Sequence, residues 1–156
     1  MLKYTDTKVT FAEVPDEISL CINISNCPNH CKGCHSPYLT EDIGILLTDS
    51  EIYKLINNNH GISCICFMGG DLYPSELVML ALYIKSYTKL KVAWYSGNED
   101  LKIDPRLGAF DYIKIGSYKE ELGPLNSKTT NQKMFKIICK DNDAEFEDIT
   151  HLFQEL

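Results

Sequence analysis

The chain has 156 residues, of which 44% are hydrophobic and 24% are charged. This length fits one domain of about 100 to 200 residues, and the composition is that of a globular protein. Acidic side chains outnumber basic ones by 22 to 15, which disfavours nucleic acid as a partner because phosphate binding depends on Lys and Arg. We therefore expect a single domain over residues 1–156 that binds no nucleic acid.

The longest apolar runs, such as residues 62–68 and 77–84, are far shorter than the roughly 20 residues of a transmembrane helix. Residues 1–10 are polar and lack the hydrophobic segment of a signal peptide. These features predict a cytoplasmic protein with no membrane partner. Seven cysteines are many for that compartment, where grouped thiols more often bind metal or take part in chemistry than form disulfides.

The first half of the chain predicts two strands, a loop and a helix. Apolar and polar residues alternate over residues 18–24, which is typical of a strand with one apolar face. A short edge strand is expected over residues 8–14, and a cysteine-rich loop over residues 26–37. Thr48 and Glu51 have the spacing of a capping box, so a helix is expected to start there.

The second half predicts buried strands alternating with helices. The short apolar run of residues 63–68, which ends at Gly69, is expected to be a buried strand. Residues 90–95 and 111–115, each followed within two residues by glycine, are expected to be two further strands. A helix is expected from Pro74 onward, and another strand over residues 134–139. Asp143 is expected to cap a final helix. The inward-facing residues of that helix would be Phe146, Ile149, Leu152 and Phe153.

Strands that alternate with helices or crossover segments predict an α/β fold with a mostly parallel sheet. The chain is too short for a closed eight-stranded barrel of about 250 residues, so we expect a short partial (open) β/α barrel. Ligands in such folds bind at the carboxyl ends of the strands. Those ends carry the cysteine-rich loop, Gly69 to Asp71, Ser96 with Gly97, and Gly116.

Three of the cysteines, Cys27, Cys31 and Cys34, have the spacing C-x3-C-x2-C. Three thiolates on one short loop can bind a single metal centre, either zinc or an iron–sulfur cluster. A zinc site could add His30 or His35 as a fourth ligand. A cubane with three cysteines leaves one iron open to another ligand. The spacing alone leaves both interpretations open.

The C-x3-C-x2-C spacing resembles that of the radical S-adenosylmethionine enzymes. The resemblance implies a 4Fe-4S cluster on Cys27, Cys31 and Cys34, with S-adenosylmethionine chelating the open iron. It also implies that one electron from the cluster cleaves S-adenosylmethionine into methionine and a 5'-deoxyadenosyl radical. No side chain would then act as a general acid or base, and the protein would position and shield the reactants.

A second motif strengthens the resemblance. Gly69-Gly70-Asp71 is similar to the family's Gly-Gly-Glu motif, which holds the methionine amino group mostly through its backbone, with Asp71 in place of Glu. The resemblance also implies that Ser96 contacts the methionine carboxylate or the ribose, a turn or cap hydroxyl being the alternative. With these residues, His35 completes the expected set of cofactor-binding residues.

Gly33 departs from the general family, in which an aromatic residue commonly precedes the last cysteine and helps to hold the adenine. The stretch Cys-Lys-Gly-Cys-His at residues 31–35 instead resembles one branch, the activating proteins of anaerobic ribonucleotide reductases. Residues 94–97, and segments between 112 and 133 that include Asn131-Gln132-Lys133, are also similar to that branch. The resemblance covers nearly the whole chain.

The branch implies a function and two protein partners. The enzyme would install a glycyl radical on an anaerobic (class III) ribonucleoside-triphosphate reductase, and a flavodoxin or ferredoxin-type protein would donate the electron. Alternatives are an activase of another glycyl radical enzyme such as pyruvate formate-lyase, a small-molecule radical enzyme, or a non-catalytic zinc or iron–sulfur module. The other four cysteines are expected to be small buried hydrophobic residues in strands: Cys21, Cys64, Cys66 and Cys139.

Overall fold

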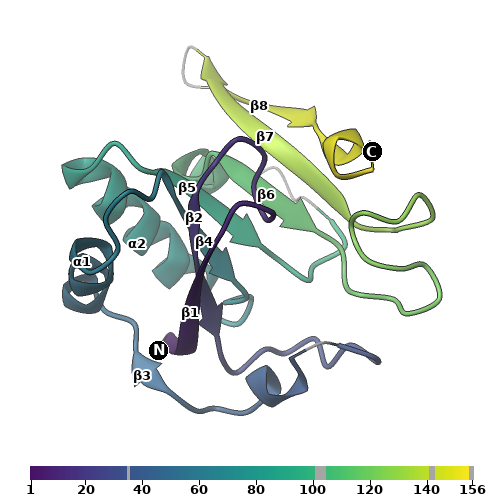
Figure 1. The fold of residues 1–156 in the computed structure, drawn as a ribbon, viewed down its shortest axis with the longest axis horizontal. Helices are drawn as coiled ribbons and strands as arrows, with labels where there is room; N and C mark the ends of the chain where they lie inside the picture. Colours follow the sequence, from purple (N-terminus) through teal and green to yellow (C-terminus); the bar gives the residue numbers. More distant parts are fainter. Residues whose placement is uncertain (35, 101–104, 141–142, 155–156) are drawn as a thin grey trace.

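The computed structural model describes residues 1–34, 36–100, 105–140 and 143–154. They form an α/β protein with an eight-stranded sheet and, within these ranges, two α-helices (Figure 1). The strands are β1 (Lys3–Thr10), β2 (Ser19–Ile24), β3 (Ile45–Leu46), β4 (Cys64–Met68), β5 (Lys91–Tyr95), β6 (Tyr112–Ile115), β7 (Lys133–Lys140) and β8 (Asp143–Asp148). The helices are α1 (Asp49–Asn57), α2 (Pro74–Tyr87) and the short 3₁₀ segments η1 (Pro37–Thr40), η2 (Pro105–Ala109) and η3 (Thr150–Phe153).

The sheet is mixed, in the order β3-β1-β2-β4-β5-β6-β7-β8. The central strands β2, β4, β5 and β6 are parallel to one another. The pairs β3–β1, β1–β2, β6–β7 and β7–β8 are antiparallel. The α/β class is therefore confirmed, but the expectation of a mostly parallel sheet is wrong, because hairpin partners extend the parallel centre on both sides.

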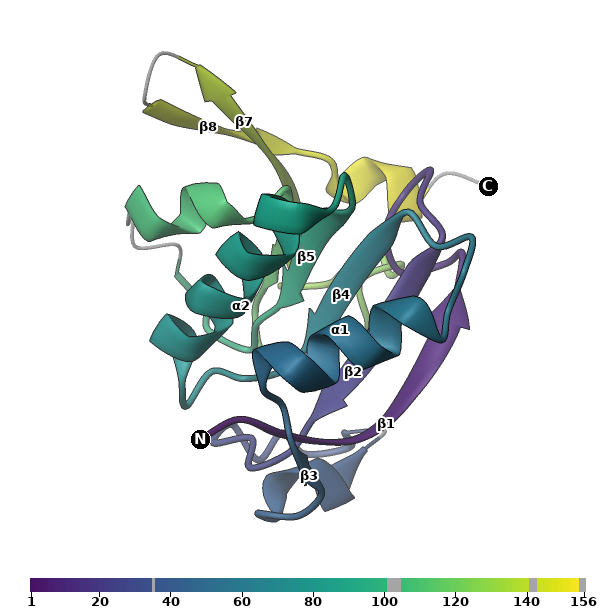
Figure 2. The ribbon, with the colours of Figure 1, turned by 90° about the vertical axis from the view of Figure 1, so that its left-hand side faces the viewer.

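Both α-helices cover one face of the sheet (Figure 2). The predicted helix start is confirmed, since Thr48 is the N-cap of α1 and its Oγ1 accepts a hydrogen bond from the Glu51 backbone N–H at 3.2 Å. The Glu51 carboxylate accepts from the Tyr4 hydroxyl at 2.6 Å, so the structure shows the N-cap half of the predicted capping box. The expected apolar face of α2 is buried against the sheet and consists of Leu77, Leu80, Ala81 and Ile84. Among the described residues, no helix is both long and apolar enough to cross a bilayer.

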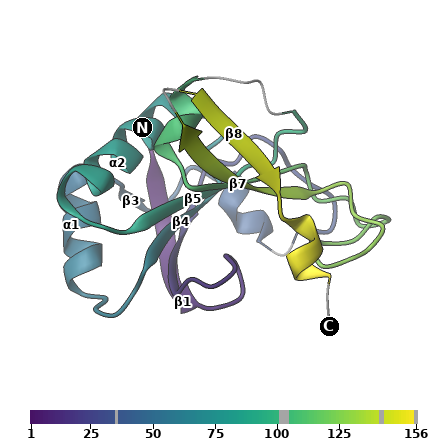
Figure 3. The ribbon, with the colours of Figure 1, turned by 90° about the horizontal axis from the view of Figure 1, so that it is seen from above.

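The opposite face of the sheet carries a second apolar cluster, which includes Cys21, Cys66, Tyr112 and Met134. Seen from above, η3 and the loop after β6 lie away from α1 and α2 (Figure 3). With both faces covered, β2 is buried on its polar side as well, and Ser19 and Cys21 are inaccessible alongside the apolar residues. This explains why β2 has two buried faces where the alternation predicted one.

Two expected elements differ from the structure. The strand predicted at the sheet edge over residues 8–14 is β1, which spans Lys3–Thr10 and has the short strand β3 outside it. The predicted final helix is wrong: Asp143 begins strand β8, which pairs with β7, and η3 follows it. The side chains of β8 alternate between exposed and partly buried over its first four residues. Phe146 packs edge-on against Phe135, with ring centroids 6.4 Å apart.

Candidate functional site

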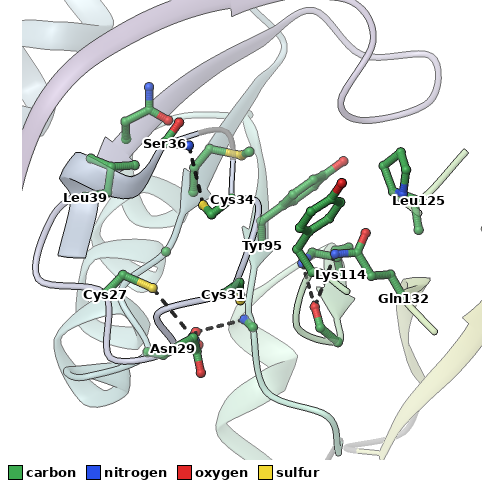
Figure 4. Close-up of a pocket in the computed structure, with 18 of the residues that line it drawn as sticks. Cys27, Asn29, Cys31, Cys34, Ser36, Leu39, Tyr95, Lys114, Leu125 and Gln132 are labelled. Atoms are coloured by element: carbon green, nitrogen blue, oxygen red, sulfur yellow. Dashed lines mark hydrogen bonds between the residues drawn. The ribbon is translucent and has the colours of Figure 1, made fainter. Parts of the chain in front are cut away.

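The parallel strands end together at one edge of the sheet. β2 leads into the cysteine-bearing loop that begins at Asn26, β4 into Gly69, and β5 into Ser96. A cavity of about 540 Å³ opens at this edge. Its walls include Cys27, Asn29, Cys31, Cys34 and Lys114 (Figure 4), and Asp71 also lines it. The strand ends that carry the cysteines and the glycine turns therefore surround one cavity.

The Asp71 carboxylate joins three segments of this site. Its Oδ1 accepts a hydrogen bond from Ser96 Oγ at 2.6 Å. Its Oδ2 accepts from the Gly97 backbone N–H and from Asn29 Nδ2, each at 2.8 Å. An ionised carboxylate can only accept, so all three bonds suit its charged form. Asp71 thus connects the turn after β4 to the end of β5 and to the cysteine-bearing loop.

The Gly69-Gly70 turn needs glycine at both positions. Their φ angles are +107° and +95°, a region that residues with side chains rarely adopt. A Cβ on Gly70 would lie 2.6 Å from Leu77 Cδ1 in the core. The backbone of Gly69 is held on two sides: its N–H donates to Tyr95 O at 3.1 Å, and its carbonyl accepts from Trp94 Nε1 at 2.9 Å.

All three predicted metal ligands, Cys27, Cys31 and Cys34, line the cavity and are partly exposed. The Cys34 sulfur accepts from the Ser36 backbone N–H at 3.4 Å, and the Cys27 sulfur from Asn29 Nδ2 at 3.9 Å. Within the described residues, however, no group of three or more His, Cys, Asp or Glu side chains is arranged to hold a metal ion. The three cysteines therefore line the same cavity, but their sulfur atoms are not positioned to bind one metal ion.

Lys114 is a cavity residue that sequence reasoning missed. It is 8% exposed on β6, and its ammonium donates to Gly116 O at 3.0 Å and lies 5.6 Å from the centre of the Tyr95 ring. Burial lowers the pKa of Lys114, and the charges of Asp71 and Cys31 partly oppose this effect. Among the described residues that line the cavity, it is the only Lys or Arg. The sequence signal that could have identified Lys114 is a lysine between two isoleucines in the strand Tyr-Ile-Lys-Ile.

The far wall of the cavity is formed by Tyr95, Leu125 and Gln132 (Figure 4). Tyr95 donates its hydroxyl hydrogen to Glu13 O, and burial raises the pKa of this phenol well above its usual value. Gln132 is buried and donates to Gly116 O at 3.4 Å. Of the Asn131-Gln132-Lys133 stretch, Gln132 is the residue that lines the cavity.

The other predicted site residues are placed as follows. Ser96 is buried, and its hydroxyl accepts from the Asn98 backbone N–H at 3.1 Å in addition to its bond to Asp71, which is the behaviour of a turn hydroxyl. A contact between Ser96 and a cofactor stays a prediction. His35 lies outside the described residues. His30, the other histidine beside the thiols, lines the cavity.

Three of the four remaining cysteines behave as expected: Cys21, Cys64 and Cys66 are buried in β2 and β4. Burial raises the pKa of Cys64 to about 12 and that of Cys66 well above its usual value. The expectation for Cys139 is wrong, because it is exposed on β7. β7 extends with β8 past the body of the sheet, so its later residues have fewer neighbours (Figure 1).

Comparisons with protein-family models, with curated proteins and with solved structures found no match to this chain. The fold and the site define an α/β protein with a thiol-lined cavity at the carboxyl edge of four parallel strands. The residues of that cavity are the basis for assigning a function.

Proposed function

We propose that this protein is a radical S-adenosylmethionine enzyme that activates an anaerobic ribonucleoside-triphosphate reductase. One observation carries the proposal: three segments far apart in the chain, all of which resemble that family, meet at one cavity. These are the cysteine loop, the Gly69-Gly70-Asp71 turn and the Ser96-Gly97 end of β5, which Asp71 bonds together. We further propose that β2, β4, β5 and β6 are the parallel part of a short partial β/α barrel of the radical S-adenosylmethionine type.

The donor set suits a 4Fe-4S cluster in kind, and its three members line the same cavity. Cys27, Cys31 and Cys34 offer three thiolates, which leaves one iron of a cubane without a protein ligand. Cluster binding would draw the three sulfurs together. The described residues between β2 and η1 form neither helix nor strand, so this movement breaks no regular hydrogen-bond ladder.

The cavity also suits S-adenosylmethionine. Its volume of about 540 Å³ lies within the roughly 300–1,000 Å³ of small-molecule sites. The backbone of Gly69 would receive the methionine amino group, and the Lys114 ammonium would attract the methionine carboxylate. When bound, the cluster supplies one electron that splits S-adenosylmethionine into methionine and a 5'-deoxyadenosyl radical. The role of the protein is to hold the cluster and S-adenosylmethionine in the correct relative position and to exclude water.

The partners follow from this chemistry. A flavodoxin or ferredoxin-type protein would reduce the cluster. The reductase would present a glycine whose Cα loses one hydrogen atom to the radical. The sheet is open, with β3 and β8 as its outermost strands, and an open sheet suits a polypeptide substrate better than a closed barrel would.

The test is an anaerobic mixture of reconstituted protein, S-adenosylmethionine, a low-potential reductant and an anaerobic ribonucleotide reductase. The proposal predicts a glycyl radical EPR signal on the reductase and stoichiometric 5'-deoxyadenosine, both of which Cys34→Ala should abolish. A radical formed on pyruvate formate-lyase but not on the reductase would identify an activase of another enzyme. Retention of zinc with no cleavage of S-adenosylmethionine would identify a binding module.

A further inference from the structure

Asn29 lies between two cysteines of the loop and contacts both Asp71 and the Cys27 sulfur. We propose that Asn29 and Asp71 form a positioning pair that holds the cysteine loop against β5 and directs an amide N–H toward the Cys27 sulfur. The effect on a cluster rests on the proposed function. The positioning of the loop does not depend on a cluster and can be tested in the protein alone.

The orientation of Asn29 is determined by its partner. An ionised Asp71 has only acceptor sites, so the nitrogen of the Asn29 amide must face it rather than the oxygen. The Nδ2–Oδ2 distance is 2.8 Å, and the same nitrogen lies 3.9 Å from Cys27 Sγ. An amide nitrogen carries two hydrogens in a fixed plane, so binding one of them to Asp71 restricts the direction of the other.

The surroundings fit this pair closely. A Cβ on Gly97 would lie 2.4 Å from Asn29 Nδ2 and 3.4 Å from Asp71 Oδ2, so a side chain at residue 97 would displace the Asn29 amide. Ser96 and Gly97 bind the other acceptor positions of Asp71. The residues that follow β5 thus hold the carboxylate in addition to its bond to the loop. This makes Asp71 a positioning residue, whereas the Gly-Gly-Glu resemblance implied a cofactor contact.

A hydrogen bond to a cluster thiolate stabilises the extra negative charge of the reduced cluster and raises its reduction potential. Removal of the Asn29 amide should therefore shift the potential to a more negative value. Removal of the Asp71 charge would by itself raise the potential, so the charge-neutral Gly97→Ala, which displaces the Asn29 amide, is the variant that should shift the potential in the same direction. A direct contact between Asp71 and S-adenosylmethionine would instead change affinity for that molecule without moving the loop.

The chain offers a matched control in Glu99. Its carboxylate accepts from the Ser117 backbone N–H at 3.1 Å, from the Ser117 hydroxyl and from Asn131 Nδ2 at 3.3 Å. This is the same set of donors that Asp71 binds, a Ser hydroxyl, a backbone N–H and an Asn amide. Only the Asn bound by Asp71 belongs to the cysteine loop, so Glu99→Gln reports the loss of such a carboxylate elsewhere in the fold.

The first measurement uses the protein without a cluster. Lys32 is exposed within the loop, and trypsin cleavage after it can be timed by mass spectrometry. Asn29→Ala, Asp71→Asn and Gly97→Ala should each speed this cleavage several-fold, while Glu99→Gln should leave it at the wild-type rate. Equal rates in all five proteins, the wild type included, would overturn the proposal.

The second measurement is an EPR-monitored redox titration of the reconstituted proteins. Asn29→Ala and Gly97→Ala should both lower the midpoint potential, and the double variant should show no further shift, because both changes act through the same amide. Faster cleavage with an unchanged potential would overturn the bond to Cys27. If the wild type forms no cluster, the proposed function fails and the cleavage rates alone decide whether the pair holds the loop.

Discussion

Trp94 Nε1 donates a hydrogen bond to the Gly69 carbonyl oxygen at 2.9 Å. Trp94 is 6% exposed on β5, and its ring lies 5.4 Å from that of Phe110 between the sheet and the helices. A core side chain therefore fixes the direction of a backbone carbonyl whose residue lines the candidate site. The packing of β5 and the shape of the cavity are linked through this bond.

Trp94→Phe should lower the free energy of unfolding by at least about 2 kcal/mol, because it leaves the Gly69 carbonyl without its indole donor and removes ring volume. It should also weaken binding of S-adenosylmethionine to the reconstituted protein. Urea unfolding and equilibrium dialysis measure the two effects. Phe110→Leu is the control, since it should cost stability and leave the affinity near that of the wild type. Wild-type affinity in Trp94→Phe would contradict the link.

Gly70→Ala and Gly61→Ala separate backbone strain from steric overlap. Both glycines have positive φ, +95° and +88°, but an added Cβ overlaps Leu77 at Gly70 and meets nothing within 4 Å at Gly61. Gly61→Ala should cost about 1 kcal/mol from strain alone, and Gly70→Ala about 2 to 4 kcal/mol more. Urea denaturation of both variants measures the difference. Equal losses would mean that the turn after β4 relaxes away from α2.

Stability should fall at alkaline pH. Burial raises the pKa of Cys64 from 9.0 to about 12, so between these values the unfolded chain has lost a proton that the folded chain keeps. The free energy of unfolding then decreases as pH rises, by up to about 1.4 kcal/mol per pH unit for this group. Below pH 9 its contribution is constant. Cys64→Ala should show a shallower decline over the same range, and parallel curves would contradict the assignment.

The cysteines divide into two classes that mutation should separate. Cys27→Ala, Cys31→Ala and Cys34→Ala should each lose the cluster after anaerobic reconstitution, while the unfolding free energy of the cluster-free protein changes by less than about 0.5 kcal/mol. Cys64→Ala should keep the cluster and lose about 1 kcal/mol from its buried position. Bound iron and urea unfolding test both. A cluster retained in Cys34→Ala and lost in Cys64→Ala would overturn the ligand assignment.

Sequence reasoning succeeded where the signal was local. The helix N-cap at Thr48, the apolar face of α2 and the short strands β4, β5 and β6 depend on neighbouring residues, and the structure has them at those positions. The segment after Asp143 was predicted to be a helix from the spacing of its apolar residues, and this prediction was wrong. Pairing with β7, which no local pattern reveals, made it a strand.

The site was predictable in outline and not in its contacts. The cysteines and the Gly-Gly turn could be marked because each is an unusual local motif. The bond between Asn29 and Asp71 joins residues 42 positions apart, and spacing carries no information about such a pair. Lys114 faces the cavity because of the register of β6 beside β5, which depends on the assembled sheet.

The most direct measurement is EPR of the anaerobically reconstituted and reduced protein, recorded with and without S-adenosylmethionine. The account predicts a 4Fe-4S signal that changes when S-adenosylmethionine is added, because the molecule binds the iron that Cys27, Cys31 and Cys34 leave open. It also predicts release of 5'-deoxyadenosine. Bound zinc with no cluster signal and no cleavage would contradict the account and leave the three cysteines as a structural metal site.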